Sequence, residues 1–132
     1  MPADNLIDGR AIAREVHAET EFRVATLKSD GIEPGLVFVR VGEDSASKVY
    51  VGMKERAAAR LGIRSETTAL PEDTPEAELL KLLAKLNADS RVHGVLVQAP
   101  LPSHIDETKV FSTVSPSKDV DGFHPVNVGR LM

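Results

Sequence analysis

The sequence contains no cysteine and no tryptophan, and only 4% of its 132 residues are aromatic. Without cysteine, the chain forms neither a disulfide nor a thiolate metal site. With one tyrosine and four phenylalanines, the core has to be mainly aliphatic, and an aromatic residue at a ligand site stands out. A chain of this length buries about two thirds of its unfolded surface, which is enough for one domain without such cross-links.

The sequence also lacks an excess of basic charge and a long apolar run. Its 16 lysines and arginines oppose 20 aspartates and glutamates, giving a net charge of −4 with both signs interspersed. This balance argues against a nucleic-acid or anionic-membrane partner. The N-terminal residues show no basic stretch followed by an apolar one, and no run approaches the roughly 18 residues of a membrane-spanning helix. We therefore expect a cytoplasmic protein with no nucleic-acid or membrane partner.

Hydrophobic periodicity predicts helices and strands that alternate along the chain. Two near-continuous apolar runs are typical of strands covered on both faces, and amphipathic stretches with capping signals separate them. This alternation predicts an α/β fold of three layers, helix–sheet–helix, with a small and mostly parallel sheet. The expected elements are a helix from Asp8 to Gly31, a strand over 35–42, a helix over 44–61, a weaker strand over 63–70, a helix capped by Thr74 and Pro75, a strand over 92–98 and a short helix near 105–111.

The last third of the chain is interrupted by prolines, Pro125 among them, and is expected to be rich in loops. Loops that follow buried strands are where α/β sheets place functional residues. The sequence has no internal repeat, no G-x-G-x-x-G motif and no phosphate-binding loop. It therefore shows no sign of a dinucleotide site of its own.

The helix over 44–61 carries three polar residues along one border of its expected apolar stripe. At about 100° per residue, Ser47, Tyr50 and Lys54 lie within about 60° of one another. An amine at such a border loses hydration, which suits it to proton transfer. The alternative is a lysine that extends its charge to solvent beside a half-buried tyrosine. The expected stripe consists of Ala46, Val49, Met53, Ala57 and Leu61.

Two further positions point to the carboxyl edge of the sheet. Gln98 ends the strand over 92–98, where its amide orients a neighbouring side chain or satisfies loop backbone. Asp119 and Asp121 stand beside Gly122, where aspartates cap a turn, bind a metal or present a carboxylate to a ligand. No further acid or histidine completes a metal-ligand set at a recognisable spacing, so no metal site is predicted. No role is assigned to His17, His93, His104 and His124.

Three segments together resemble the signatures of bifunctional methylenetetrahydrofolate dehydrogenase/methenyltetrahydrofolate cyclohydrolase, the FolD family. They are SKVYVGMK at 47–54, GVLVQAPLP at 94–102 and PSKDVDGFHP at 116–125. The resemblance runs from the first helix to the last residue and implies a domain like the N-terminal domain of amino-acid dehydrogenases. Ala99 replaces a usual leucine and Ser45 a common proline, and neither change removes a polar group.

The resemblance implies a multifunctional enzyme of one-carbon metabolism, both oxidoreductase and hydrolase. NADP would oxidise 5,10-methylene-tetrahydrofolate, and water would then convert the 5,10-methenyl product to 10-formyl-tetrahydrofolate. The implied catalytic roles are acid/base chemistry by Lys54 and a hydrogen bond from Gln98 that holds Lys54, with support from Ser47. Tyr50 would stack on the aminobenzoyl ring, with its hydroxyl in the proton network, and Pro100 would contact the folate. Asp121 would recognise the pterin, and Asp119 would have a structural role.

The resemblance further implies that residues 1–132 are the N-terminal, folate-binding catalytic domain. The family's C-terminal dinucleotide-binding domain, which holds NADP, is expected to be absent from this chain, so the chain alone binds no cofactor. Full-length members usually form homodimers, mainly through that domain, so the oligomeric state of this chain stays open. Two alternatives stay open as well: a folded folate-binding fragment without catalytic competence, and the substrate domain of a related amino-acid or shikimate dehydrogenase.

Overall fold

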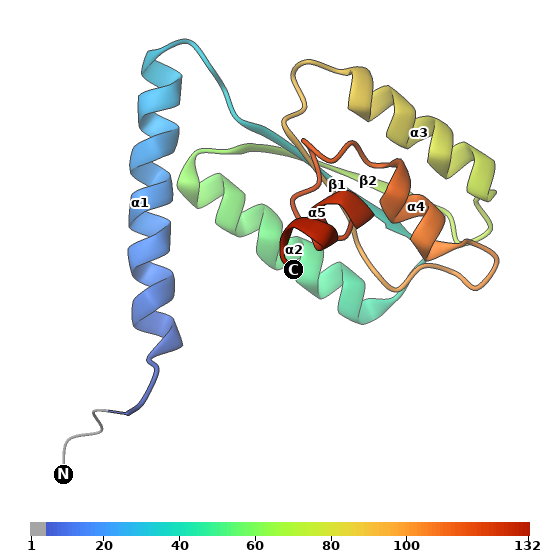
Figure 1. Ribbon diagram of the computed structural model, residues 1–132, viewed down its shortest axis with the longest axis horizontal. Helices are drawn as coiled ribbons and strands as arrows, with labels where there is room; N and C mark the ends of the chain where they lie inside the picture. The colour runs from blue at the N-terminus through green and yellow to red at the C-terminus, as the bar shows by residue number, and fades with distance from the viewer. Residues whose placement is uncertain (1–4) are drawn as a thin grey trace.

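The computed structural model describes residues 5–132, in which helices and strands alternate around one sheet (Figure 1). The predicted α/β class is confirmed, and the sheet is parallel throughout. The elements are α1 (Gly9–Ser29), β1 (Gly35–Val41), α2 (Ser45–Leu61), β2 (Arg64–Leu70), α3 (Glu76–Ala88), β3 (Gly94–Val97), α4 (Glu107–Thr113) and α5 (Pro125–Arg130).

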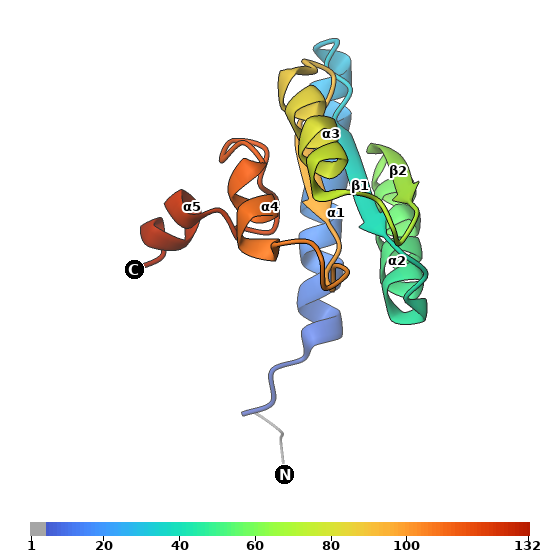
Figure 2. The ribbon, with the colours of Figure 1, turned by 90° about the vertical axis from the view of Figure 1, so that its right-hand side faces the viewer.

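The three strands lie in the order β2-β1-β3, with β1 at the centre. β1 pairs along its whole length with β2, and its residues Leu36 to Val39 pair with β3. Because the strands are parallel, all three reach their carboxyl ends at the same edge of the sheet. α2 lies on one face and α4 on the other, as Figure 2 shows, so the molecule has the expected three layers.

The face of the sheet that α3 and α4 cover holds the larger hydrophobic core, which we call the α3-side core. Side chains alternate across a strand, so Val37, Val39 and Val41 all point to this face. Leu79 and Leu83 of α3 are fully buried against them. Each such leucine stabilises the fold by about 1.5–3 kcal/mol relative to an exposed one. The other buried members are Val92, Val95, Val97, Leu101, Ile105, Val110 and Val114.

The face that α2 covers holds a smaller group, the α2-side cluster. Its buried members are Phe38 of β1, Val51 of α2 and Leu96 of β3, with Leu36 packed against them. The predicted apolar stripe of this helix is wrong, because Val49 is 57% exposed and Met53 is 55% exposed. α2 instead turns Ser47, Val51 and Ala58 toward the sheet, because the small Ser47 and Ala58 allow the helix to approach it closely.

Side-chain and glycine caps set the ends of two predicted helices. Asp8 accepts hydrogen bonds from the Arg10 and Ala11 N–H groups of α1, and Asp44 accepts one from the Ser47 N–H of α2. α2 ends at Gly62, whose φ of 82° is readily adopted only by glycine. The predicted cap of α3 is wrong in part, since its N-cap Pro75 makes no side-chain bond and the Thr74 hydroxyl donates to the Pro71 carbonyl.

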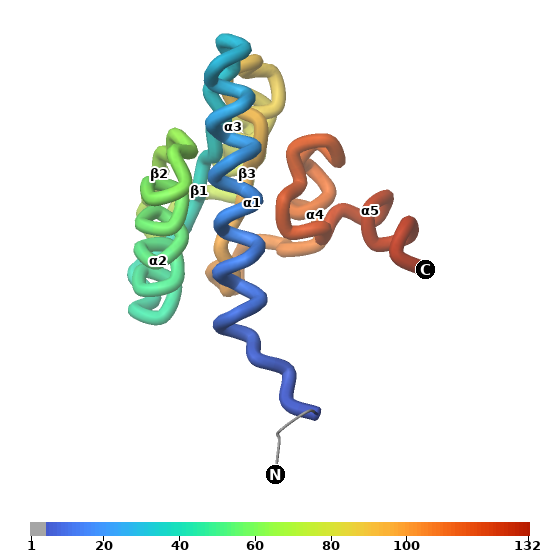
Figure 3. The backbone as a smooth tube through the Cα atoms, turned by 90° about the vertical axis from the view of Figure 1, so that its left-hand side faces the viewer, coloured from blue at the N-terminus to red at the C-terminus, as the bar shows by residue number. Residues whose placement is uncertain are grey.

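α1 stands at the amino end of the sheet and contacts the C-terminal end of α2 (Figures 1 and 3). The predicted apolar residues of this helix recur at helical spacing, but the buried one is Val24. Ile12 and Val16 are about half exposed, and Leu27 is partly exposed. Among residues 5–132, no helix combines the length and the apolar character that crossing a membrane requires.

The last third of the described chain contains α4, close to the predicted short helix, and one helix that the sequence analysis missed. α5 begins at Pro125, where the sequence predicts an interruption rather than a helix. Proline suits the first helical position because its missing N–H would have no partner there. The His124 ring accepts a hydrogen bond from the N–H of Val126 and caps this helix.

Candidate active site at the carboxyl edge of the sheet

Lys54 and Gln98 meet where the carboxyl edge of the sheet faces α2. Lys54 Nζ donates a hydrogen bond to Gln98 Oε1 at 2.9 Å. Gln98 follows the last residue of β3, and its backbone N–H still bonds to the Val39 carbonyl at 2.8 Å. Its side-chain Nε2 donates to the Ala99 carbonyl at 3.0 Å, which leaves the amide oxygen facing the lysine. The structure thus places the lysine amine against a neutral acceptor of fixed orientation.

The loop after β3 joins this pair to the first turn of α2. Buried Ser47 donates from Oγ to the Ala99 carbonyl at 3.4 Å. The following Ala99–Pro100 peptide bond is cis, and Pro100 itself lies at the surface. The loop is held from the other side by Glu107 of α4, whose carboxylate accepts from the Leu101 N–H at 2.9 Å. Ser47 therefore contacts the loop that carries Gln98 and Pro100.

Tyr50 lies one turn before Lys54 on α2, with 54% of its surface exposed. It is the only tyrosine in the sequence. Its ring packs into neither hydrophobic cluster of the described residues, so a face of the ring is open to a ligand. A planar aromatic group approaching Lys54 along α2 would meet this ring.

Asp121 brings a carboxylate to the same place from the loop before α5. It is half-buried, and this burial raises the pKa of its carboxyl above the ordinary value. The nearby Lys54 ammonium opposes the rise in that pKa, and the Asp119 charge adds to it. A carboxylate short of hydration accepts hydrogen bonds strongly from a ligand with paired N–H donors.

An apolar hollow of about 280 Å³ runs along α2 beside Lys54. The lysine contributes the one charged side chain of its lining. The hollow lies on the less filled face of the sheet, next to the α2-side cluster. The rest of the lining is Leu36, Phe38, Ala57, Ala58, Leu61, Ile63, Leu96 and Val120.

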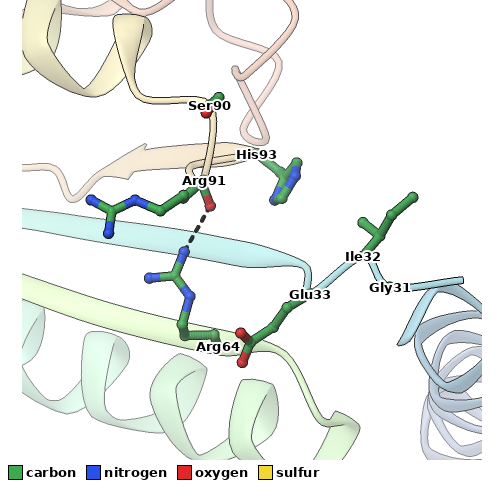
Figure 4. Close-up of a pocket in the computed structure, with 7 residues that line it drawn as sticks. All are labelled: Gly31, Ile32, Glu33, Arg64, Ser90, Arg91 and His93. Carbon is green, nitrogen blue, oxygen red and sulfur yellow. Dashed lines mark hydrogen bonds between the residues drawn. The ribbon is translucent and has the colours of Figure 1, made fainter. Parts of the chain in front are cut away.

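A second hollow, of about 480 Å³, opens at the opposite, amino edge of the sheet (Figure 4). Two of its polar residues, Arg64 and His93, are engaged in hydrogen bonds within the fold. Arg64 donates to the Arg91 carbonyl at 2.7 Å, and the His93 ring accepts from the Gly35 N–H at 3.0 Å. His93, without a role in the sequence analysis, therefore supports the start of β1. The lining consists of Gly31, Ile32, Glu33, Arg64, Ser90, Arg91 and His93.

Acidic side chains stand at the N-termini of α2, α3 and α4. A helix N-terminus binds phosphate through free backbone N–H groups, and the Asp44 and Asp106 carboxylates each accept from one such group, that of Ser47 in α2 and that of Lys109 in α4. The first turn of α3 carries Glu76 and Glu78, which repel an anion. No buried side-chain nitrogen or oxygen in residues 5–132 lacks a hydrogen-bond partner. In the same residues, no group of three or more histidine or acidic side chains is placed to hold a metal ion.

The sequence matches the family model described as the tetrahydrofolate dehydrogenase/cyclohydrolase catalytic domain over residues 7–121. It is 56% identical over 127 residues to the bifunctional protein FolD of Geotalea uraniireducens, covering 96% of this chain and 45% of that protein. It is 55% identical to that of Moorella thermoacetica, covering 100% of this chain and 47% of the relative. The chain spans about half the length of the curated relatives it matches.

Solved structures show the same fold. The chain superposes with a TM-score of 0.92 on the FolD dehydrogenase/cyclohydrolase of Campylobacter jejuni, at 44% identity, covering 94% of this chain and 44% of that one. The Trypanosoma brucei enzyme, whose structure holds NADP cofactor and an inhibitor, gives a TM-score of 0.90 at 38% identity. That match covers 99% of this chain and 45% of the other.

Proposed function

The chain belongs to the tetrahydrofolate dehydrogenase/cyclohydrolase family, and on this premise we propose that it forms the folate-binding, lysine-bearing side of an enzyme that interconverts one-carbon folates. The reactions are NADP-dependent oxidation of 5,10-methylene-tetrahydrofolate and hydrolysis of 5,10-methenyl-tetrahydrofolate to 10-formyl-tetrahydrofolate. The 2.9 Å bond between Lys54 and Gln98, beside half-buried Asp121, carries the proposal. Membership of this family sets aside the amino-acid and shikimate dehydrogenase alternative.

Lys54 is the proposed acid/base group of the hydrolysis. Water adds its oxygen to the methenyl carbon and loses one proton, the bond from that carbon to N5 breaks, and N5 takes up a proton. The second water proton leaves, so the reaction releases one proton overall. Gln98 Oε1 engages one N–H of Lys54 and so orients the amine, which in its neutral form accepts the water proton and delivers one to N5.

The other site residues bind the folate in this proposal. Asp121 accepts from the paired N–H groups at the pterin edge, and the open ring of Tyr50 stacks on the aminobenzoyl group. The Tyr50 hydroxyl joins the proton network around Lys54. Ser47 and Pro100 border the folate where the loop after β3 meets α2. These residues come from three separate segments of the chain and converge only in the folded protein.

No step of the hydride transfer is assigned to the described residues. We propose that residues 1–132 act as the folate-binding catalytic unit and that a domain outside this sequence holds NADP. The relatives' greater length and the acidic helix N-termini of this chain support that division. A cytoplasmic location remains a prediction from the sequence.

A second candidate function is folate binding without turnover by this chain alone. The observation that favours it is the open side of the site, where Tyr50 is half exposed. Hydrolysis of the methenyl group benefits when bulk water is kept away from the reacting atoms. An open site would bind the folate and leave the catalytic pair too solvated for rapid reaction.

Substitution of Lys54 tests the proposal. The purified chain is titrated with 5,10-methenyl-tetrahydrofolate, and hydrolysis is followed by the loss of methenyl absorbance. We expect Lys54→Met to lower the hydrolysis rate by about 100-fold or more, because it removes the acid/base group. Binding of tetrahydrofolate should change by only a few fold, since methionine keeps much of the apolar stem.

Lys81→Met is the matched control, because Lys81 is an exposed lysine of α3 on the far side of the sheet. It should hydrolyse at the wild-type rate. A Lys54→Met protein that keeps wild-type hydrolysis would contradict the role of Lys54. A wild-type chain that binds tetrahydrofolate but hydrolyses nothing would favour the second candidate, and a chain that binds no folate would refute both.

A further inference from the structure

The loop that carries Asp121 is organised by one carboxylate, that of Asp119. Asp119 Oδ1 accepts from the backbone N–H groups of Gly122 at 3.1 Å and Phe123 at 3.3 Å. Asp119 Oδ2 accepts from the His124 N–H at 2.8 Å and from Asn127 Nδ2 at 2.9 Å. Four donors from a span of six residues thus converge on a single side chain, and none of the four belongs to Asp121.

This arrangement requires an ionised carboxylate. Burial alone would raise the pKa of Asp119, but the hydrogen bond from Asn127 and those from the three backbone N–H groups hold that pKa below its ordinary value. Hydrogen bonds to an ionised acceptor are about twice as strong as neutral ones. An asparagine at this position has the same shape, but its NH₂ group cannot accept a hydrogen bond, so it would lose the donors on one side.

Both ends of the loop are tied to the rest of the fold. Before it, the Val95 N–H of β3 donates to the Lys118 carbonyl at 2.8 Å, and Val95 forms a parallel bridge with Asp119. After it, Asn127 of α5 donates from Nδ2 to the Pro116 carbonyl at 2.9 Å as well as to Asp119. Asn127 therefore closes the loop from its far side.

The close approach of the loop to β3 depends on Gly94. A Cβ atom at this position would lie 2.5 Å from Leu36 Cδ2 and 2.6 Å from Val120 Cγ1, which is too close for either. Val120 stands between the two aspartates in sequence, so the missing side chain of Gly94 lets this part of the loop approach the sheet. Asp121 is thereby half-buried near Lys54 before any ligand arrives.

We propose that Asp119 and Asn127 are positioning residues, which hold the Asp121 carboxylate in its ligand-binding place without touching the ligand. The inference rests on the proposed function, because it takes a tetrahydrofolate as the ligand of Asp121. A preformed loop spares the complex the entropy loss of ordering that loop on binding. Loosening it therefore weakens folate binding and raises KM, while kcat at the Lys54–Gln98 pair stays unchanged.

A double-mutant cycle on the full 132-residue chain tests this, with tetrahydrofolate as the titrant. We expect Asp119→Asn to raise Kd by about tenfold, comparable to the loss of one charge-assisted hydrogen bond. Asn127→Ala removes one of the four donors and should raise Kd by about two- to fivefold. In a protein that already carries Asp121→Asn, adding Asp119→Asn or Asn127→Ala should raise Kd by less than a further twofold, because both residues act through Asp121.

Asp89→Asn is the matched control, since the Asp89 carboxylate also accepts from a backbone N–H, that of Arg91, at the opposite edge of the sheet. It should leave Kd unchanged. The inference is overturned if the Asp119 and Asp121 effects on Kd multiply independently, if Asp121→Asn alone leaves Kd unchanged, or if both loop variants bind like the wild type. Should Asp119→Asn fail to fold, the Asn127→Ala cycle decides alone. A wild-type chain that binds no tetrahydrofolate refutes the proposed function instead.

Discussion

The two faces of the sheet differ in how completely they are filled. On the face covered by α3 and α4, twelve buried residues form one continuous core. On the face covered by α2, three buried residues form a small cluster beside a hollow of about 280 Å³. Lys54 lies at this hollow, and Asp121 lies close to the lysine. The α3-side core supplies most of the stability, whereas the face covered by α2 is less tightly packed where the proposed folate site lies.

The central strand connects the two faces. Val37, Val39 and Val41 point into the α3-side core, whereas Leu36 and Phe38 point to the side of α2. β1 is therefore held rigidly by one face, and the other face can stay open without loss of order. A site on a rigid support keeps its groups in place before the ligand arrives, which lowers the free-energy cost of binding.

The largest expected effect comes from removing volume on the filled face. Leu83→Ala should lower the free energy of unfolding by about 2–5 kcal/mol, because the packed surroundings cannot collapse into the cavity. Leu96→Ala, on the α2 face, should fall near the lower end of that range, since a hollow already adjoins it. Urea unfolding of both variants measures the difference, and equal losses would contradict the contrast between the faces.

An intermediate effect is expected at Asp121. Asp121→Asn should weaken tetrahydrofolate binding about tenfold or more, because a hydrogen bond to a charged acceptor is worth about 1.5–3 kcal/mol. The same change should stabilise the free chain at neutral pH. Burial raises the pKa of Asp121 in the folded state, so its ionisation costs stability above that pKa. Calorimetric titration and thermal unfolding measure the two effects, and a variant that is destabilised at neutral pH would contradict the second.

The smallest expected effect is a pH dependence of folding stability through Asp89, which lies away from the proposed folate site. The Arg91 side chain and backbone N–H lower the pKa of Asp89 to about 2. This depressed pKa stabilises the folded state above the ordinary value of 3.8, and the contribution is lost as pH falls toward 2. The unfolding midpoints of wild type and Asp89→Asn should therefore converge between pH 4 and about 2. A gap that stays constant over this range would contradict the assignment.

Much of the secondary structure could be predicted because its signals are local. Near-continuous apolar runs marked β1 and β3, and Asp8, Asp44 and Gly62 marked helix ends. The buried side of α2 could not be predicted in this way. Its sequence is apolar on several sides, and the sheet selects the side with small residues. α5 was missed because Pro125 was taken for an interruption rather than for a first helical residue.

The candidate site was predicted from three motifs, and their meeting is a property of the fold. Spacing along one helix relates Tyr50 to Lys54, but the bond to Gln98 spans 44 positions and depends on the sheet. The four-donor arrangement at Asp119 was beyond the sequence analysis, because it needs the loop conformation around Gly122 and the presence of α5. The signal available for it was the segment Asp-Val-Asp-Gly at 119–122, with an asparagine eight residues after its first aspartate.

β1 is the first strand to be synthesised, and its cover is completed much later. Its partner β2 lies on one side and its partner β3 on the other, and the α3-side core closes only with Val114. During synthesis from the N-terminus, the apolar face of β1 thus stays without its full cover until some seventy residues beyond the strand have been made. Contacts so distant in sequence slow the folding of a domain. The strand that makes the mature sheet rigid is therefore the one most exposed to aggregation in the growing chain.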